Sequence, residues 1–312
     1  MTAAGLIRNI PVPVCGLALG MASLDRFLSQ NHDFYTYGIF AAFSAFLIVL
    51  FTLRMVVSPG TVRKDLESPI LFGVLPTYQM TVMILSTYVV GFSDVLAKAI
   101  WLTALVSMFA MMPLFLRRFA VGFDMRKVFP SWFVMFIGCV VGSVTSAALG
   151  FTDVGRGLFW FGLAAYAVLF PLILYRALVI RGIPEPAIPN LAIFAAPPNL
   201  LLAGYLAAFG AGADEMVVTV LMVLGVTSYL AVLAYMPFMM RRRFYPSYGA
   251  FTFPMVISMV SINAAGVFLG LSDGPFRILE IASEVIAVCF VVYVLIRYAM
   301  FFGETFANTG TG

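Results

Sequence analysis

The feature that most constrains the fold is a succession of apolar stretches, each about 20 residues long, that recurs along the chain. A helix needs roughly 20 apolar residues to cross a bilayer, and in lipid it must satisfy its own backbone hydrogen bonds. Only 10% of the residues are charged, whereas soluble domains carry about 25%. We therefore predict an all-α integral membrane protein in which residues 1–312 form a single transmembrane domain in contact with the lipid bilayer.

Charged residues and Gly/Pro breaks divide the apolar sequence into ten predicted spans. Their approximate bounds are 12–30, 35–57, 69–91, 95–117, 130–150, 155–180, 189–210, 215–240, 246–270 and 276–302. Of the 18 Lys and Arg residues, 14 fall on the side that holds both termini. Because cytoplasmic loops carry the excess of Lys and Arg, we expect a multi-pass protein of the cell (inner or plasma) membrane with both termini cytoplasmic. The net charge of +4 then reflects topology and indicates no nucleic-acid partner.

The spans form a repeat. Odd-numbered spans begin at a proline, and even-numbered spans end on an arginine, so that a unit of roughly 59 residues occurs five times. The starting prolines are Pro13, Pro69, Pro130, Pro189 and Pro246. Each unit is predicted to be a helical hairpin, and five equal hairpins can close around an axis with quasi-fivefold symmetry. Glycines are concentrated in the odd spans, where small residues let backbones approach closely. The odd helices are therefore predicted to form an inner ring and the even helices an outer, lipid-facing ring.

Each odd span contains a second break a few residues after its first proline. These breaks are Gly20, Pro76, Gly138, Pro197 and Pro254. Irregular backbone at membrane depth is tolerated where it lines an aqueous cavity, so these kinks are predicted to line a central pore. Thr252, Ser258 and Ser261 are candidate pore-lining hydroxyls. The alternative is that they bond back to carbonyls freed by the kinks.

The residues that precede the five breaks are all apolar. They are Leu19, Leu75, Ile137, Ala196 and Phe253. A ring of apolar side chains in a narrow pore acts as a dewetting gate, and Phe253, the largest member, is the candidate plug over a constriction formed by the other four. The alternative interpretation of Phe253 is an ordinary core- or lipid-facing aromatic residue.

Three segments carry a resemblance to a known family: "AFTFPM" after the kinked repeat, "NIPVPVCGLALGMASL" in the first span and "FPSWFVMFIGCVVGS" in the fifth. They resemble the tellurite-resistance/dicarboxylate transporter family, which includes bacterial tellurite-resistance protein A and the slow anion channels of plant guard cells. The resemblance implies five hairpins around a pore, a homotrimer, and passage of small inorganic or organic anions. It also implies that Phe253 corresponds to the family's gating phenylalanine.

Two functions remain open at this point. The first is a channel for chloride- or nitrate-like anions, in which the positive dipole ends of kinked helices favour anions within an uncharged pore. The second is a secondary carrier or exporter of dicarboxylates such as malate, of sulfite or of tellurite-type oxyanions. Glu280 and Glu284, one turn apart in the tenth span, would then couple transport to protons. The alternative role for these acids is interfacial pairing with Arg277 or with a neighbouring protomer.

The chain offers little for catalysis, cofactor binding or metal binding. Its three cysteines lie in apolar spans without paired spacing, and the one histidine, His32, lies in a polar loop. Nucleotide-binding and hydrolase motifs are absent from the sequence. We therefore expect no enzymatic activity, no cofactor and no metal.

Overall fold

The computed structural model of the protein describes residues 7–32 and 38–309, with 305–309 described as backbone only. Within these residues every regular element is helical, so the predicted all-α class is confirmed. Eight helical segments are long and apolar enough to cross a membrane, and a bent pair, Ser131–Ile137 with Val140–Leu149, is a ninth candidate. The first predicted span, 12–30, contains α2 (Val14–Asn31). This helix is not among the candidates, because polar residues in its C-terminal half lower its hydropathy.

The odd spans of the repeat correspond to five inner segments, four of which are divided in two. The first inner segment is α2. The others are α5 (Pro69–Val74) with α6 (Thr77–Val89), α8 (Ser131–Ile137) with α9 (Val140–Ser146), η4 (Glu185–Ala195) with α11 (Ala196–Phe209), and η6 (Pro246–Phe251) with α13 (Thr252–Phe268). The elements η4 and η6 are tight 3₁₀ turns. Residues at or beside the division of each of these four segments line one central cavity, described below.

The even spans correspond to five outer helices, which run without a break through their apolar stretches. These are α3 (Ile39–Val57), α7 (Asp94–Phe119), α10 (Thr152–Tyr175), α12 (Glu215–Met240) and α14 (Phe276–Thr309). Between 22% and 33% of the residues in their apolar windows are buried, against 67% to 78% in three of the inner segments. The inner segments therefore form the core, and the outer helices present apolar side chains outward.

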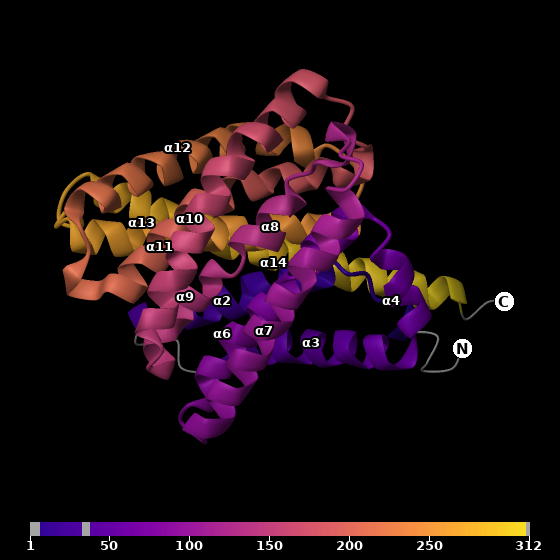
Figure 1. Ribbon diagram of the computed structural model, residues 1–312, viewed down its shortest axis with the longest axis horizontal. Helices are drawn as coiled ribbons and strands as arrows, with labels where there is room; N and C mark the ends of the chain where they lie inside the picture. The colour runs from indigo at the N-terminus through magenta and orange to yellow at the C-terminus, as the bar shows by residue number, and fades with distance from the viewer. Residues whose placement is uncertain (1–6, 33–37, 310–312) are drawn as a thin grey trace.

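The inner segments contact one another in a closed order. Contacts join α2 to α6, α6 to α9, α9 to α11, α11 to α13, and α13 back to α2. Each outer helix packs against the inner segment that precedes it in the chain. In the view of Figure 1, α2, α11 and α13 lie between α12 above and α3 below.

The prolines of the inner segments lie where a helix begins. Pro76 is the residue before α6, Pro197 lies in the first turn of α11, and Pro254 is the third residue of α13. Proline has no backbone N–H group. The N–H groups of the first helical turn make no hydrogen bond within the helix, so a proline at this place removes none. Gly138 lies between α8 and α9, which are bent by 47°. These four positions therefore separate or begin the half-helices.

The predicted break at Gly20 is not found in the structure. Gly20 lies inside the continuous helix α2 and makes no break. A Cβ atom at this position would lie 2.5 Å from the Cβ and Oγ1 atoms of Thr252 and 3.1 Å from the backbone nitrogen of Phe253. Gly20 therefore permits close approach of α2 to α13, which is the other use that membrane helices make of glycine.

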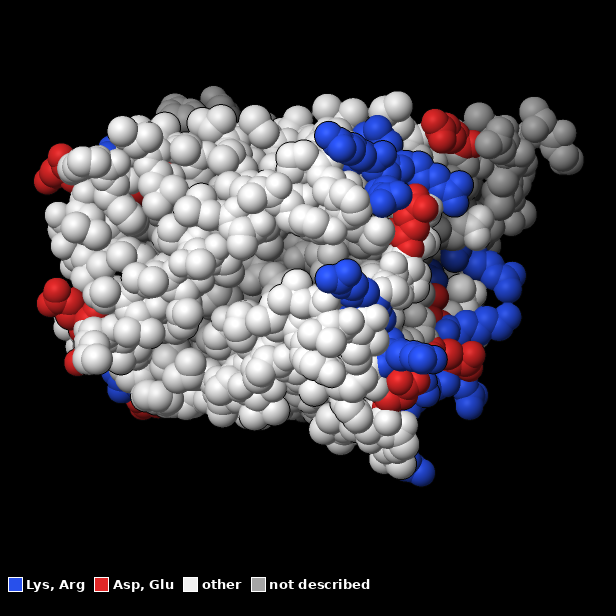
Figure 2. All heavy atoms as spheres, turned by 90° about the horizontal axis from the view of Figure 1, so that it is seen from above, with Lys and Arg blue, Asp and Glu red and all other residues white. Residues whose placement is uncertain are grey.

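Charged residues are separated toward the two ends of the molecule. Figure 2 shows most of the visible Lys and Arg, together with some Asp and Glu, at one end of the long axis, a smaller group of mainly Asp and Glu at the other end, and a broad uncharged surface between them. An uncharged surface of this kind is what the hydrocarbon region of a bilayer requires. The sequence and the fold together define a multi-pass membrane protein.

Candidate anion pore

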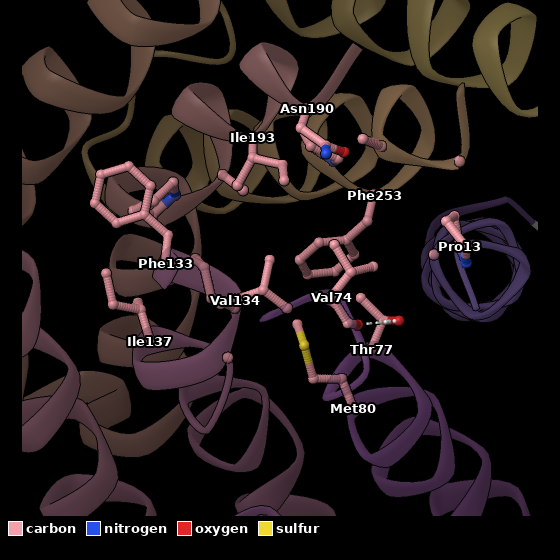
Figure 3. Close-up of a pocket in the computed structure, with 18 residues that line it drawn as sticks. Pro13, Val74, Thr77, Met80, Phe133, Val134, Ile137, Asn190, Ile193 and Phe253 are labelled. Atoms are coloured by element: carbon pink, nitrogen blue, oxygen red, sulfur yellow. Dashed lines mark hydrogen bonds between the residues drawn. The ribbon is translucent and has the colours of Figure 1, made fainter. Parts of the chain in front are cut away.

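A cavity of about 50 Å³ lies where the half-helices of the inner segments meet. All five inner segments, including the turn that begins α2, contribute to its lining, as Gly16, Thr77, Ile137, Ala196 and Phe253 illustrate. This volume exceeds the roughly 10–15 Å³ that a cavity needs to hold one water molecule. The cavity is therefore a narrow internal space shared by the whole inner ring (Figure 3).

The cavity wall is almost entirely apolar. None of the described residues that line it is charged, and only Thr77 and Asn190 bring polar side chains to it. The Thr77 hydroxyl donates a hydrogen bond to the carbonyl oxygen of Val74 at 2.8 Å. Three helices of the inner ring, α6, α11 and α13, begin beside the cavity, so their positive dipole ends lie close to it. The C-terminal residues of α5 and α8, Val74 and Ile137, also line the cavity, so its uncharged wall is bordered by helix ends of both kinds.

Phe253 occupies a central position in this lining. It is the second residue of α13, its exposed fraction is 6%, and it lines the cavity. Figure 3 shows its ring in the middle of the labelled side chains. The preceding residue, Thr252, donates hydrogen bonds to the carbonyl oxygens of Gly16 at 2.9 Å and Gly249 at 2.8 Å. These bonds fix the start of α13, which carries the ring, against α2.

The predicted constriction residues divide into two pairs. Ile137 and Ala196 line the cavity together with Gly138, Pro197 and Pro254. Leu19 and Leu75 do not line it and are buried in the hydrophobic core, and Gly20 and Pro76 are not lining residues either. The first inner segment is unbroken at Gly20. It lines the cavity with Pro13, the residue before α2, and with Gly16 in the first turn of α2. The second inner segment contributes Val74, Thr77 and Met80 on either side of its break.

The three candidate hydroxyls bond to carbonyls and to a buried amide, and none lines the cavity. Ser258 Oγ donates to the carbonyl oxygen of Pro254 at 2.7 Å, and Ser261 Oγ donates to Asn199 Oδ1 at 2.7 Å. Asn199 Nδ2 lies 2.9 Å from Ser258 Oγ and 3.0 Å from the carbonyl oxygen of Gly225. These contacts form a buried polar cluster that joins α11, α12 and α13. Of the two uses considered for these hydroxyls, the structure shows bonding to carbonyls.

The two acids of α14 lie away from the cavity and have partners. Glu280 is fully buried, accepting hydrogen bonds from Ser272 Oγ at 2.6 Å and from Arg277 Nη1 at 2.8 Å. Glu284 Oε2 lies 3.2 Å from His32 Nε2. The contact with Arg277 is the interfacial pairing considered as an alternative, whereas the contact with His32 was not anticipated. No group of three potential metal ligands occurs among the described residues.

Sequence reasoning missed Asn190, the one amide that lines the cavity. The predicted polar pore residues were Ser and Thr near the second break of an odd span. Asn190 instead follows Pro189, the residue that begins the fourth repeat. Its place directly after a repeat-defining proline is the signal that could have identified it.

An uncharged cavity enclosed by broken helices within a multi-pass helical fold is typical of a membrane channel or transporter. The SLAC1 family model, described as voltage-dependent anion channel, matches residues 14–299 of this chain. The chain therefore belongs to that family, and the resemblance noted in the sequence is confirmed. Membership supports an anion channel or transporter in general. The curated proteins include no significant match to the chain.

Proposed function

We propose that this protein is an anion-selective channel that conducts small anions, such as chloride or nitrate, through the central cavity. The observation that carries the proposal is a single cavity lined by all five inner segments, with Phe253 among the lining residues and no charged side chain in the described wall. Residues 14–299 match the family of voltage-dependent anion channels, which agrees with this choice. The conducting path would run along the axis enclosed by the inner segments.

Selectivity for anions would arise from backbone dipoles. The N-termini of α6, α11 and α13 lie beside the cavity, and each N-terminus carries roughly half a positive elementary charge. A diffuse positive field attracts an anion without forming the tight ion pair that a buried arginine would make. A weakly held ion can leave again, which conduction requires. An uncharged wall is therefore compatible with both selectivity and flux.

Phe253 is proposed to be the gate. Its ring lies among the apolar side chains that enclose the cavity, so we expect it to obstruct the path of a hydrated anion. Removal of the ring would open the narrowest part of the path. Apolar constrictions also resist hydration, so the same substitution would let water fill the pore.

We further propose that the five hairpins surround the pore with quasi-fivefold symmetry in ten spans. The closed order of contacts among the inner segments and the low burial of the outer helices support this arrangement. The assembly is proposed to be a homotrimer in the cell membrane, as the family resemblance implies. Both termini are proposed to be cytoplasmic, on the basis of the Lys and Arg count.

A proton-coupled carrier remains the alternative function. It would require a titratable group whose protonation alters the substrate path. Among the described residues that line the cavity none is titratable, and Glu280 and Glu284 have partners on or near α14. These contacts support the channel over the carrier.

The test is electrical recording of the purified protein and of Phe253→Ala in planar bilayers. We expect little current from the native protein and an increase of at least about tenfold in the variant, with reversal potentials that follow the chloride gradient. A reversal potential that follows the cation gradient would contradict anion selectivity. Saturable malate flux driven by a proton gradient, with no current through either protein, would support the carrier instead.

A further inference from the structure

Asn190 is a buried residue whose amide nitrogen has no acceptor among the described residues. Its exposed fraction is 3%, it lines the central cavity, and its Nδ2 atom is buried without a hydrogen-bond partner. An asparagine amide carries two N–H donors on this nitrogen. Buried polar groups in folded proteins are nearly always paired, because loss of hydration without a replacement hydrogen bond is costly. An ion or ligand that accepts from Nδ2 inside the cavity would supply the missing partner.

The other polar groups near this position are satisfied. Thr77, the second polar residue of the wall, donates to Val74. Asn199, in the next element of the same inner segment, lies within hydrogen-bond distance of the carbonyl oxygens of Ala195 and Gly225 and of Ser258 Oγ. Asn190 therefore differs from both residues, because it is a lining residue whose side-chain nitrogen has no hydrogen-bond partner among the described residues.

The position of Asn190 is suited to contact with an ion that approaches the gate. It lies in η4, before the break of its inner segment. Figure 3 shows it on the same segment as Ile193, with the ring of Phe253 between this segment and the side chain of Met80 in that view. No acceptor among the described residues holds the amide nitrogen in place. A side-chain rotation that brings the N–H₂ group to the cavity would therefore break no hydrogen bond of this nitrogen.

We propose that the N–H₂ group of Asn190 is the side-chain ligand for a partly dehydrated, monovalent anion beside the Phe253 gate. This inference rests on the proposed channel function and adds a defined binding site to it. A charge-assisted hydrogen bond from an amide replaces one of the water contacts that the anion loses in the apolar cavity. The helix N-termini around the cavity add a positive field, and the described lining contains no carboxylate that would favour a cation.

The first test compares Asn190→Leu with a matched control in the Phe253→Ala background. Gln79→Leu is the control, since Gln79 is also a buried amide with an unpaired atom, but it lies on α6 outside the cavity. Chloride conductance is measured over a range of symmetric concentrations. We expect Asn190→Leu to raise the half-saturating chloride concentration about tenfold, as loss of one hydrogen bond to a charged group predicts. Gln79→Leu should leave it within about twofold.

A second variant tests the sign of the interaction. Asn190→Asp keeps the shape of the side chain but replaces the donor with a carboxylate, so anion current should fall below that of Asn190→Leu. Asn190→Gln retains the amide and is the control for a general effect of substitution on folding. It should keep more of the chloride affinity than Asn190→Leu does. Equal half-saturating concentrations for the parent and Asn190→Leu would overturn the proposed ligand.

Binding can also be measured without conduction. Crystals of the full-length protein grown with bromide should show anomalous density within hydrogen-bond distance of Asn190, and Asn190→Leu crystals should lack it. Density for water alone at this position in bromide crystals would overturn the inference, even if Phe253→Ala conducts anions. Absence of anion current from Phe253→Ala, with bromide bound at Asn190, would instead refute the proposed channel and leave the binding site standing.

Discussion

The inner segments and the outer helices use similarly apolar sequences for opposite purposes. Four inner segments are divided in two, three of them are 67% to 78% buried in their apolar windows, and their buried hydroxyls bond to carbonyls. The outer helices run unbroken through the same depth and are 22% to 33% buried. Pro113, Pro171 and Pro237 lie inside outer helices without ending them.

The comparison shows that proline alone does not make a break. In the inner segments the proline coincides with the first turn of the second half-helix, where its missing N–H costs nothing. The outer prolines lie in the last two turns of their helices, where neighbouring helices and local adjustment can absorb the lost bond. Substitutions in each region can test whether this difference also governs stability.

The largest effect is expected at the contact between α2 and α13. Gly20→Leu would place a branched side chain where even a Cβ atom would lie 2.5 Å from Thr252. Thr252 cannot move aside without losing its bonds to Gly16 and Gly249. Overpacking by single methylenes typically costs about 1–3 kcal/mol, so the larger leucine should leave no folded protein after size-exclusion chromatography.

The matched control is Gly157→Leu on the outer helix α10. A Cβ atom at Gly157 meets no neighbour within 4 Å, and a leucine there would lie on the exposed outer surface of the helix. Its elution profile and melting temperature should match those of the native protein. If both leucine variants fold equally well, the close approach of α2 to α13 does not limit stability.

A smaller effect is expected where an outer helix ends. The Arg54 guanidinium, 4% exposed, forms an ion pair with Asp65 at 2.5 Å, and its Nε and Nη1 atoms have no partner among the described residues. Asp65→Ala would leave a buried charge unpaired, which should cost about 3 kcal/mol and lower the melting temperature in detergent. Glu67→Ala breaks the exposed, 3.6 Å pair with Arg118 and should cost less than about 0.5 kcal/mol. Similar shifts for both variants would show that burial of Arg54 has no energetic consequence.

The sequence predicted the all-helical class because its signals are local. Prolines at the start of the odd spans and arginines at the end of the even spans depend on chain position alone, and the inner and outer elements follow them. Gly138, Pro76, Pro197 and Pro254 lie at or just after a division of their segments, as expected from their effect on backbone geometry.

The lining of the cavity was less predictable because it depends on how each helix is rotated about its axis. Gly20 occupies the same place in the repeat as Gly138, but α2 continues through it, so the lining residue becomes Gly16 instead of Leu19. Glycine serves both close packing and flexibility, and sequence alone does not distinguish the two. Asn190 was missed because its role also depends on spatial neighbours. Its amide nitrogen stands out only because no acceptor among the described residues lies within hydrogen-bond distance.

The smallest effect is expected for the polar cluster that joins α11, α12 and α13. Asn199→Ala would remove contacts with Gly225, Ser258 and Ser261, and interhelical hydrogen bonds in membranes contribute about 0.6 kcal/mol each on average. Asn263→Ala is the control, because Asn263 Nδ2 donates only within its own helix, to the carbonyl oxygen of Met259. The melting temperatures of the two variants in detergent should therefore differ by a few degrees.

Ser258 also donates a hydrogen bond to the carbonyl oxygen of Pro254, the residue after the proposed gate, so Asn199→Ala should increase leak current modestly. A destabilised variant without leak would mean that the cluster holds the helices together but does not position Phe253.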